Sequence, residues 1–386
     1  MTRRARPFQL AAIAAAALTL LSACGSSSSS GSSTTAAVTT SSATAGAAAD
    51  AAESGSAASG SAAPSSAATS ASELVGTGTG GLVVYNAQHE NLTQAWAEEF
   101  TKETGIAIEM RNGSDNELAN QIVAEGSGSP ADVFLTENSP GMNIVEQAGL
   151  FTPVDAATVA QVPAKFNPST GNWVGIAARS TVFVYNTDLL KQADLPASIM
   201  DLQNPAWQGK WAASPSGADF QAIVSAILQL EGSDATSAWL DAMKTNASVY
   251  RGNTTVMKAV NVGEIPGGVI YHYYWYGDQA KTGENSNKTK LLFWGDQDPG
   301  AFLSVSGGGV LASSTRQAQA QQFLKFITSK TGQQVVADTV YEYPIGSDVP
   351  ANPALKPIGE LQPPTIDPAS LNGPEVTDLM TQAGLI

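Results

Sequence analysis

An aromatic run at residues 271–276, Tyr-His-Tyr-Tyr-Trp-Tyr, is the stretch best suited to chemistry, and it follows an apolar segment that predicts a strand. A tyrosine cluster usually packs in a core or an interface. Where a strand ends, two neighbouring phenols can instead both turn into a cleft and bind a hard, highly charged cation, because only a strong Lewis acid keeps a group with a pKa of about 10 deprotonated. Carboxylate and imidazole groups would complete such a site, and Glu137 and His89 each follow a predicted strand. Taken singly, each could equally be an ordinary residue at a helix start.

Other positions carry residues of the kind that bind anions. The small residues 214–218 precede a predicted amphipathic helix, so their backbone N–H groups could bind an anion or could belong to an ordinary serine cap. Asn253 could likewise be a helix N-cap or a ligand contact. Arg179, in an apolar stretch, could pair with an anion or with a carboxylate of another domain. Residues 307–309, Gly-Gly-Gly, are followed by no lysine or helix start, so they predict a close approach of strands and not a phosphate loop.

Composition excludes several classes of protein. The 386 residues carry a formal net charge of −15, which disfavours nucleic acid as a partner. Cys24 is the single cysteine, so an intramolecular disulfide, a thiolate zinc site and an iron–sulfur cluster are excluded. His89 and His272 are the only histidines, which leaves little room for metal chemistry based on several imidazoles.

The N-terminal segment predicts export and a lipid anchor. Three arginines precede a short apolar run at residues 10–23, which is the architecture of a secretory signal. The sequence Leu-Ser-Ala-Cys at residues 21–24 resembles the lipobox of bacterial lipoproteins, which implies cleavage before Cys24 and its lipidation. We therefore expect a signal peptide at residues 1–23 and a lipidated Cys24. Residues 24–80, rich in Ser, Ala, Gly and Thr, then form a disordered linker, and the membrane is contacted through the anchor alone.

The remainder alternates between strand and helix patterns. Strands are predicted at residues 82–85, 106–110, 131–135, 182–185, 269–270, 291–294 and 310–311. Helices are predicted around residues 92–100, with Asn91 as the N-cap and Gly105 as the stop, and at 117–125, 143–148, 220–228, 239–244 and 323–327. This order favours parallel sheets covered by helices in two lobes. A ligand would then bind beyond the carboxyl ends of the strands, in the cleft between the lobes.

Residues 81–386 resemble the bacterial ferric-ion-binding proteins of ABC importers. The motifs occur in the same order: Tyr-Asn-Ala-Gln-His at 85–89, Ser-Pro-Ala-Asp-Val-Phe at 129–134 followed by Glu137-Asn138, Tyr-Tyr-Trp at 273–275, Asp-Pro-Gly-Ala at 298–301 and Glu-Tyr-Pro at 342–344. The resemblance implies an α/β fold of the two-lobed periplasmic-binding-protein class (type II), with mixed sheets flanked by helices and a ligand cleft at a strand hinge. It assigns residues 81–178 plus 303–355 to the N-terminal lobe and residues 179–302 plus 356–386 to the C-terminal lobe.

The resemblance also implies a ligand set for one Fe(III): His89 and Glu137 from the first lobe, Tyr273 and Tyr274 from the second. A synergistic anion, phosphate or carbonate, would complete the coordination. Its expected contacts are Asn138, Ser216, Gly217, Ala218 and Asn253 in phosphate-using members, and Arg179 in carbonate-using ones. This sequence departs from the pattern at Tyr271 and His272, where phosphate-using members have two asparagines, one of which touches the anion.

The implied protein is a binding lipoprotein and not an enzyme. It would act outside the cytoplasm as a monomer, close on Fe(III), pass it to an ABC transporter permease and release it more easily at low pH. One alternative is the same fold holding an organic cation, such as a polyamine or thiamine, in an aromatic box with acidic residues from among Glu137, Asp219, Asp296 and Asp298. That reading leaves His89 unexplained. A more distant alternative, an extracellular hydrolase with two carboxylates, has no specific signal in so acidic a chain.

Overall fold

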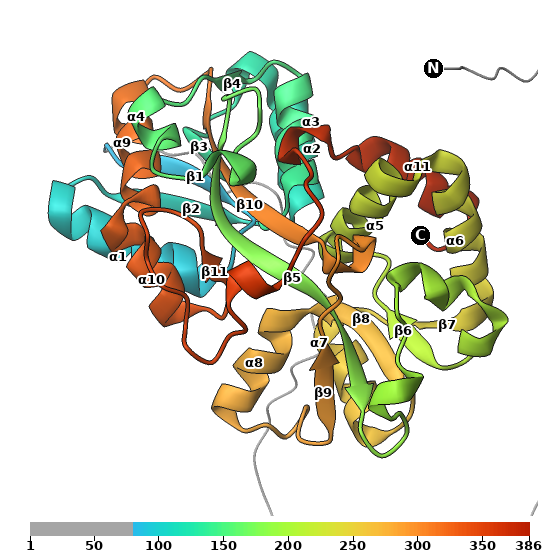
Figure 1. The fold of residues 1–386 in the computed structure, drawn as a ribbon. Coiled ribbons are helices and arrows are strands. Elements are labelled where there is room, and N and C mark those ends of the chain that lie inside the picture. The colour runs from blue at the N-terminus through green and yellow to red at the C-terminus, as the bar shows by residue number, and fades with distance from the viewer. Residues whose placement is uncertain (1–79) are drawn as a thin grey trace, which may run out of the picture. The chain divides into compact units, whose positions relative to one another are not determined.

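Two long strands, β5 (Val174–Asn186) and β10 (Leu303–Leu311), run side by side through the centre of the computed structural model, which describes residues 80–386 (Figure 1). The predicted signal peptide, Cys24 and nearly all of the predicted linker lie outside the described residues. Among the helices of residues 80–386, none combines the length and the apolar character needed to cross a membrane.

The first lobe is built on a mixed sheet. Strand β1 (Leu82–Asn86) lies between β2 (Ile108–Asn112) and β3 (Val133–Leu135), and these three strands run parallel. β10 then pairs antiparallel with β3. The elements that accompany this sheet are α1 (Glu90–Thr104), α2 (Asp115–Glu125), α3 (Ser139–Gln147), β4 (Phe151–Thr152), α4 (Ala156–Val159), α9 (Gln317–Thr328), α10 (Lys330–Thr339) and β11 (Tyr343–Pro344).

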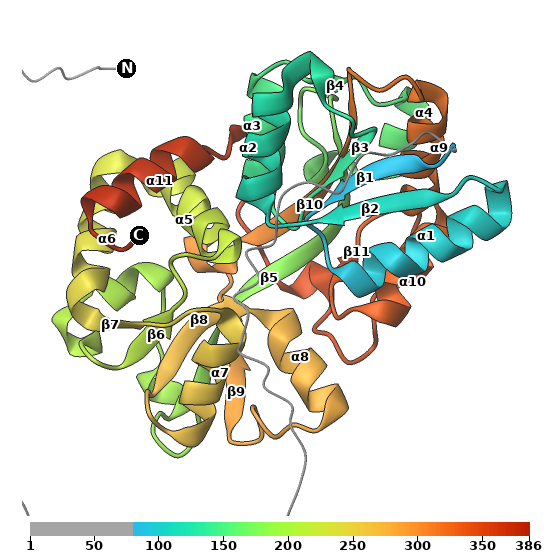
Figure 2. The same ribbon diagram turned by 180° about the vertical axis from the view of Figure 1, so that it is seen from behind.

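The second lobe repeats this plan. Strand β6 (Trp211–Ala213) lies between β7 (Ala247–Val249) and β8 (Gly267–Tyr271), again in parallel, as the view from behind shows (Figure 2). β9 (Thr289–Leu292) and β8 both pair antiparallel with β5. The helices of this lobe are α5 (Ala218–Glu231), α6 (Ser233–Asn246), α7 (Asn253–Val262), α8 (His272–Lys281) and α11 (Gly373–Gln382).

Strand β5 belongs to both sheets. Its residues from Val174 to Ser180 pair with β10, and those from Thr181 to Tyr185 pair with β8. Separate apolar cores lie on either side of this change of partner, one including Trp96 and the other including Trp211. Full burial of an aromatic side chain contributes about 1.5–3 kcal/mol, so each lobe has its own stabilising core. The fold is therefore α/β and two-lobed.

The predicted helices and strands all occur, and most of them contain more residues than predicted. The parallel pairing expected from the β–α order holds for β1–β3 and for β6–β8, whereas β5, β9 and β10 are antiparallel to their neighbours. Helix α1 begins at Glu90 with His89 as its N-cap, so the expected cap at Asn91 is wrong. Gly105 ends that helix as predicted, with a left-handed φ of 76° that glycine adopts without strain.

The triple glycine lies in β10, where the neighbouring elements come close, as predicted. A Cβ on Gly307 would lie 2.5 Å from Met142, and one on Gly309 would lie 2.5 Å from Phe151. Real Cβ atoms do not approach other atoms so closely, so glycine lets side chains of α3 and β4 pack directly against this strand.

Candidate metal centre

The four predicted iron ligands follow the carboxyl ends of parallel strands. His89 follows β1 as the N-cap of α1, and Glu137 follows β3 just before the N-cap of α3. Tyr273 and Tyr274 lie in the first turn of α8, because the strand ends at Tyr271 and a helix begins at the next residue. The break in the strand that the sequence required for two inward tyrosines is thus present. Both sheets direct these strand ends to the junction of the lobes, where α/β folds bind ligands.

The four side chains meet there. The rings of Tyr273 and Tyr274 stack with centroids 4.2 Å apart, and the ring of His89 lies edge-on to Tyr273 at 4.9 Å. His89 Nδ1 lies 3.0 Å from Glu137 Oε1. The structure therefore brings together imidazole and carboxylate from one lobe and two phenols from the other.

Asp219, in the first turn of α5, connects this cluster. Its Oδ2 accepts hydrogen bonds from Tyr274 Oη (2.9 Å), Tyr273 Oη (3.3 Å) and Asn253 Nδ2 (2.8 Å). Its Oδ1 accepts one from Asn138 Nδ2 at 3.0 Å. Sequence reasoning considered Asp219 only for an aromatic box. Its position directly after the predicted anion-binding residues was the signal that could have marked it as part of the site.

Beside the cluster lies a cavity of about 360 Å³. It is lined by four of the predicted anion contacts, together with acidic groups and one of the tyrosines: Ser216, Gly217, Ala218, Asn253, Asp115, Glu137, Asp219 and Tyr274. The N-termini of α2, α5 and α7 all contribute lining residues, so partial positive charges of three helices face it. Asn138, the fifth predicted contact, donates to both Asp115 and Asp219.

Arg179, the remaining predicted anion contact, lies in β5 beneath the cluster and is fully buried. Its guanidinium pairs with Glu342 Oε1 at 2.9 Å and with Glu137 Oε2 at 3.4 Å. Glu342 Oε1 also lies 2.8 Å from His89 Nε2. In this structure the arginine therefore pairs with carboxylates, the second of its two sequence interpretations. Glu342, which served in the sequence only as part of a matching motif, contacts the site directly.

The metal-free cluster binds protons tightly. Burial raises the pKa of Tyr273 and of Tyr274 well above the usual value, and the negative charges of Asp219 and Glu137 raise both further. Burial alone would lower the pKa of His89, but its hydrogen bonds with Glu137 and Glu342 outweigh this and raise the pKa to about 10. Both phenols and the imidazole are consequently protonated at neutral pH, and a bound cation must displace protons from its ligands.

The carboxyl groups of the site differ in the direction in which their pKa values are shifted. Burial, and then repulsion by Glu137, raises the pKa of Asp115 to about 8 and that of Asp219 to about 6. Burial also opposes the ionisation of Glu342, yet Arg179 and His89 lower its pKa to about 2. The site therefore contains more acidic groups than it can keep ionised without a cation.

Tyr271 and His272, where the sequence departs from the family pattern, have separate roles. Tyr271 donates a hydrogen bond to Asn138 Oδ1 at 3.4 Å, at the edge of the cluster. His272 is buried, stacks on Tyr343 with centroids 4.9 Å apart, and accepts a hydrogen bond from the backbone N–H of Ser180. Asp298, considered for the aromatic box, instead caps the short helix Pro299–Ala301.

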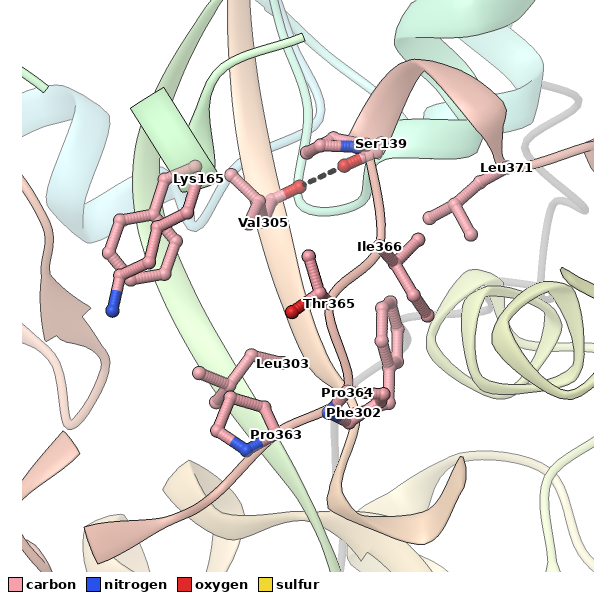
Figure 3. Close-up of a pocket in the computed structure, with 12 residues that line it drawn as sticks. Ser139, Lys165, Phe302, Leu303, Val305, Pro363, Pro364, Thr365, Ile366 and Leu371 are labelled. Carbon is pink, nitrogen blue, oxygen red and sulfur yellow. Dashed lines mark hydrogen bonds between the residues drawn. The ribbon is translucent and has the colours of Figure 1, made fainter. Parts of the chain in front are cut away.

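A second cavity, of about 220 Å³, lies elsewhere along β10 (Figure 3). Its lining is largely apolar, with Leu303, Val305 and Ile366 among its walls, and Lys165 is its one charged residue. Without a carboxylate it is unsuited to a metal cation. Within residues 80–386, histidine, cysteine and acidic residues by themselves form no group of three or more that could hold a metal ion.

Comparison with known proteins agrees with the geometry. Residues 128–367 match the sequence family described as bacterial extracellular solute-binding protein. A Fe(3+)-binding periplasmic protein of Serratia marcescens is 60% identical over 307 residues, which are 79% of this chain and 91% of that protein. The major ferric iron-binding protein of Neisseria meningitidis is 35% identical over 79% of this chain and 93% of its own length.

Solved structures show the same fold. Iron-bound HitA from Pseudomonas aeruginosa superposes with a TM-score of 0.75 at 40% identity, and covers 79% of this chain and 99% of its own. A Trichodesmium protein in complex with iron and citrate superposes with a TM-score of 0.70 at 25% identity, over 80% and 100% of the two chains. The chain therefore belongs to the bacterial extracellular solute-binding proteins, a family of binding proteins and not of enzymes.

Proposed function

We propose that this protein captures Fe(III) outside the cytoplasm, with His89, Glu137, Tyr273 and Tyr274 as ligands. The observation that carries the proposal is the stacked tyrosine pair, whose two hydroxyls meet one carboxylate beside a histidine–glutamate pair. Phenolate and carboxylate oxygens suit a hard trivalent ion. The names of the relatives from Serratia and Neisseria give independent support.

Within each of two donor pairs, the spacing suits neighbouring ligands of one ion. Around an octahedral ion with bonds of about 2.1 Å, neighbouring donors lie about 3.0 Å apart. His89 Nδ1 and Glu137 Oε1 are separated by 3.0 Å, and Tyr274 Oη and Asp219 Oδ2 by 2.9 Å. Each pair lies at hydrogen-bonding distance, and we infer that iron takes the place of the shared proton.

Asp219 is proposed as a fifth ligand in the role expected of the synergistic anion. Its carboxylate already accepts hydrogen bonds from Asn138 and Asn253, two of the expected anion contacts. A bound phosphate or carbonate would then be an additional occupant of the 360 Å³ cavity, in contact with Ser216 and Gly217, and iron binding would not depend on it.

Closure of the two lobes is proposed to couple capture to delivery. The ligands come from both lobes, and Asn116 Nδ2 on α2 donates to Gln221 Oε1 on α5 at 2.7 Å across the junction. Iron would favour this closed arrangement, and an ABC transporter permease would bind it in preference to an open one. We propose that the hinge separates an N-terminal lobe of residues 81–178 plus 303–355 from a C-terminal lobe of residues 179–302 plus 356–386. Uptake of radioactive iron by intact cells is the readout for the delivery step.

Titration of the purified monomer with a ferric chelate tests the proposal. We expect a visible phenolate-to-iron charge-transfer band that saturates at one iron per chain. Binding should release about three protons at pH 7, from the two phenols and His89, because metal ligands must be deprotonated. When the pH is lowered by one unit, the affinity for iron should therefore fall about tenfold for each proton that binding displaces. A protein that stays colourless but binds spermidine would support the organic-cation alternative instead.

A lipid anchor at Cys24 is proposed to hold the protein at the membrane surface. Replacing the thiol removes the group through which the lipid would be attached. The variant Cys24→Ser should therefore move the protein from the membrane fraction to the soluble fraction, and its iron titration should stay unchanged. An unaltered distribution between the two fractions would refute the anchor.

A further inference from the structure

A closed ring of four ionisable side chains lies under the metal cluster. His89 contacts Glu137 through Nδ1 (3.0 Å) and Glu342 through Nε2 (2.8 Å). Arg179 completes the ring by pairing with both glutamates, at 3.4 Å and 2.9 Å. The imidazole is thus held between two carboxylates, only one of which belongs to the proposed ligand set.

We propose that Glu342 is a positioning residue: its buried carboxylate lies 2.8 Å from His89 Nε2, pairs by charge with that side of the ring, and thereby leaves Nδ1 for the iron. This inference rests on the proposed function. Metal-bound histidines generally donate their second ring N–H to a carboxylate or carbonyl group, which sets the orientation of the ring and the nitrogen that binds. Glu342 is the buried carboxylate in that position here.

The difference in exposure between the two glutamates decides which nitrogen is available. The Glu342 side chain is 0% exposed, whereas the Glu137 side chain is 22% exposed and lines the 360 Å³ cavity. The Nε2 atom is buried and lies beside the fully buried Glu342, whereas Nδ1 lies beside the partly exposed ligand Glu137. An ion that binds Glu137 would have Nδ1, 3.0 Å from Glu137 Oε1, as a neighbouring ligand.

Glu342 is itself fixed by the hinge strand. Arg179, in β5, is fully buried and binds the same oxygen, Oε1, that faces His89. A hydrogen-bonded carboxylate between two cationic donors is held in one position, so the imidazole has little freedom to rotate. The edge contact of His89 with the Tyr273 ring, at 4.9 Å, restricts it from the other side.

Nitrogen NMR with gallium tests this directly. Ga(III) is a diamagnetic substitute for Fe(III), and ¹⁵N-histidine labelling gives signals from only two residues, His89 and His272. On addition of Ga(III) to the full protein we expect the His89 Nδ1 signal to shift on coordination, while Nε2 keeps its proton. Coordination through Nε2 with a protonated Nδ1 would overturn the inference and leave the iron site intact. A protein that binds neither Ga(III) nor Fe(III) would overturn the proposed function with it.

The variant Glu342→Gln keeps the shape of the side chain and removes its charge. We expect it to bind Ga(III) and Fe(III) 10–100-fold more weakly, the range for loss of a partner of a metal-bound histidine, and to show a second coordinated form of His89 in the NMR spectrum. Glu146→Gln is the matched control, because Glu146 accepts hydrogen bonds from Asn172 and Trp173 within the first lobe and should leave both readouts unchanged. Wild-type affinity together with a single Nδ1-bound form in Glu342→Gln would refute the positioning role.

Discussion

The double variant Tyr273→Phe/Tyr274→Phe is expected to remain colourless with ferric chelates and to bind iron more than about 100-fold more weakly than the wild type. A 100-fold loss of metal affinity is the upper end of the range for removing a group that hydrogen-bonds to a metal ligand. This variant removes two ligands themselves, so a larger loss is expected. The charge-transfer band requires a phenolate, which phenylalanine cannot supply. Absorbance titration and equilibrium competition with a chelator measure the two effects.

The rings themselves should stay in place in this variant. Their stacking, at a centroid distance of 4.2 Å, does not need the hydroxyl groups, so the metal-free protein should still fold. The buried carboxylate of Asp219 loses two hydrogen-bond donors, so we expect a modest decrease in the melting temperature. Tyr276→Phe is the control, since that ring stacks on Tyr341 outside the cluster. A visible band that persists in the double variant would disprove the proposed ligand set, and iron uptake by cells carrying the variant should be lost in parallel.

Asp219→Asn is expected to make iron binding depend on an added anion. The asparagine side chain has the same shape but lacks the charge that bridges both phenols and two asparagines. In buffer without phosphate, carbonate or citrate, we expect affinity to fall by more than about 100-fold, because the change removes a ligand and not only its partner. Phosphate or citrate should restore much of the loss by entering the adjacent cavity.

The wild type should show little response to the same anions, and this contrast is the essential measurement. Asp234→Asn is the matched control, since Asp234 occupies the first turn of the next helix, α6, and is exposed. The pKa values of Tyr273 and Tyr274 should also fall in Asp219→Asn, because the Asp219 charge raises both. If the variant binds iron as tightly as the wild type in anion-free buffer, Asp219 is not a ligand and the anion expected from the family resemblance takes that position.

Local patterns predicted the elements that have ordinary signals. The apolar run of β1 and the amphipathic face of α5 were both recognised, because their side chains are buried at the period of a strand or a helix. Helix α8 was not predicted, since its first turn is a run of aromatic residues that resembles a continuing strand. The antiparallel course of β5 and β10 also escaped prediction, because strand direction depends on the path of the chain and leaves no local pattern.

The residues of the candidate site also fall into two groups, those predicted from the sequence and those recognised only in the structure. His89, Glu137, Tyr273 and Tyr274 were proposed from residue type, position after strands and family resemblance, and the structure places them together. Asp219 was considered only for an aromatic box and Glu342 only as part of a matching motif, so neither was predicted to contact the other site residues. Glu342 lies 163 residues from Arg179, and Asp219 lies 81 residues from Asn138. Such pairings depend on how the two lobes meet.

Residue order alone was enough to predict an acidic, two-lobed binding protein and to suggest the export signal and the hard-cation ligand set that we propose, since composition, periodicity and motifs are properties of the linear chain. Folding in three dimensions added which carboxylates surround the phenols, which glutamate lies beside each nitrogen of His89, and which groups of the cluster bind protons tightly. These features follow from burial and from charges brought within a few ångströms by strands distant in sequence, and electrostatic energies at that range depend on positions and not on residue types.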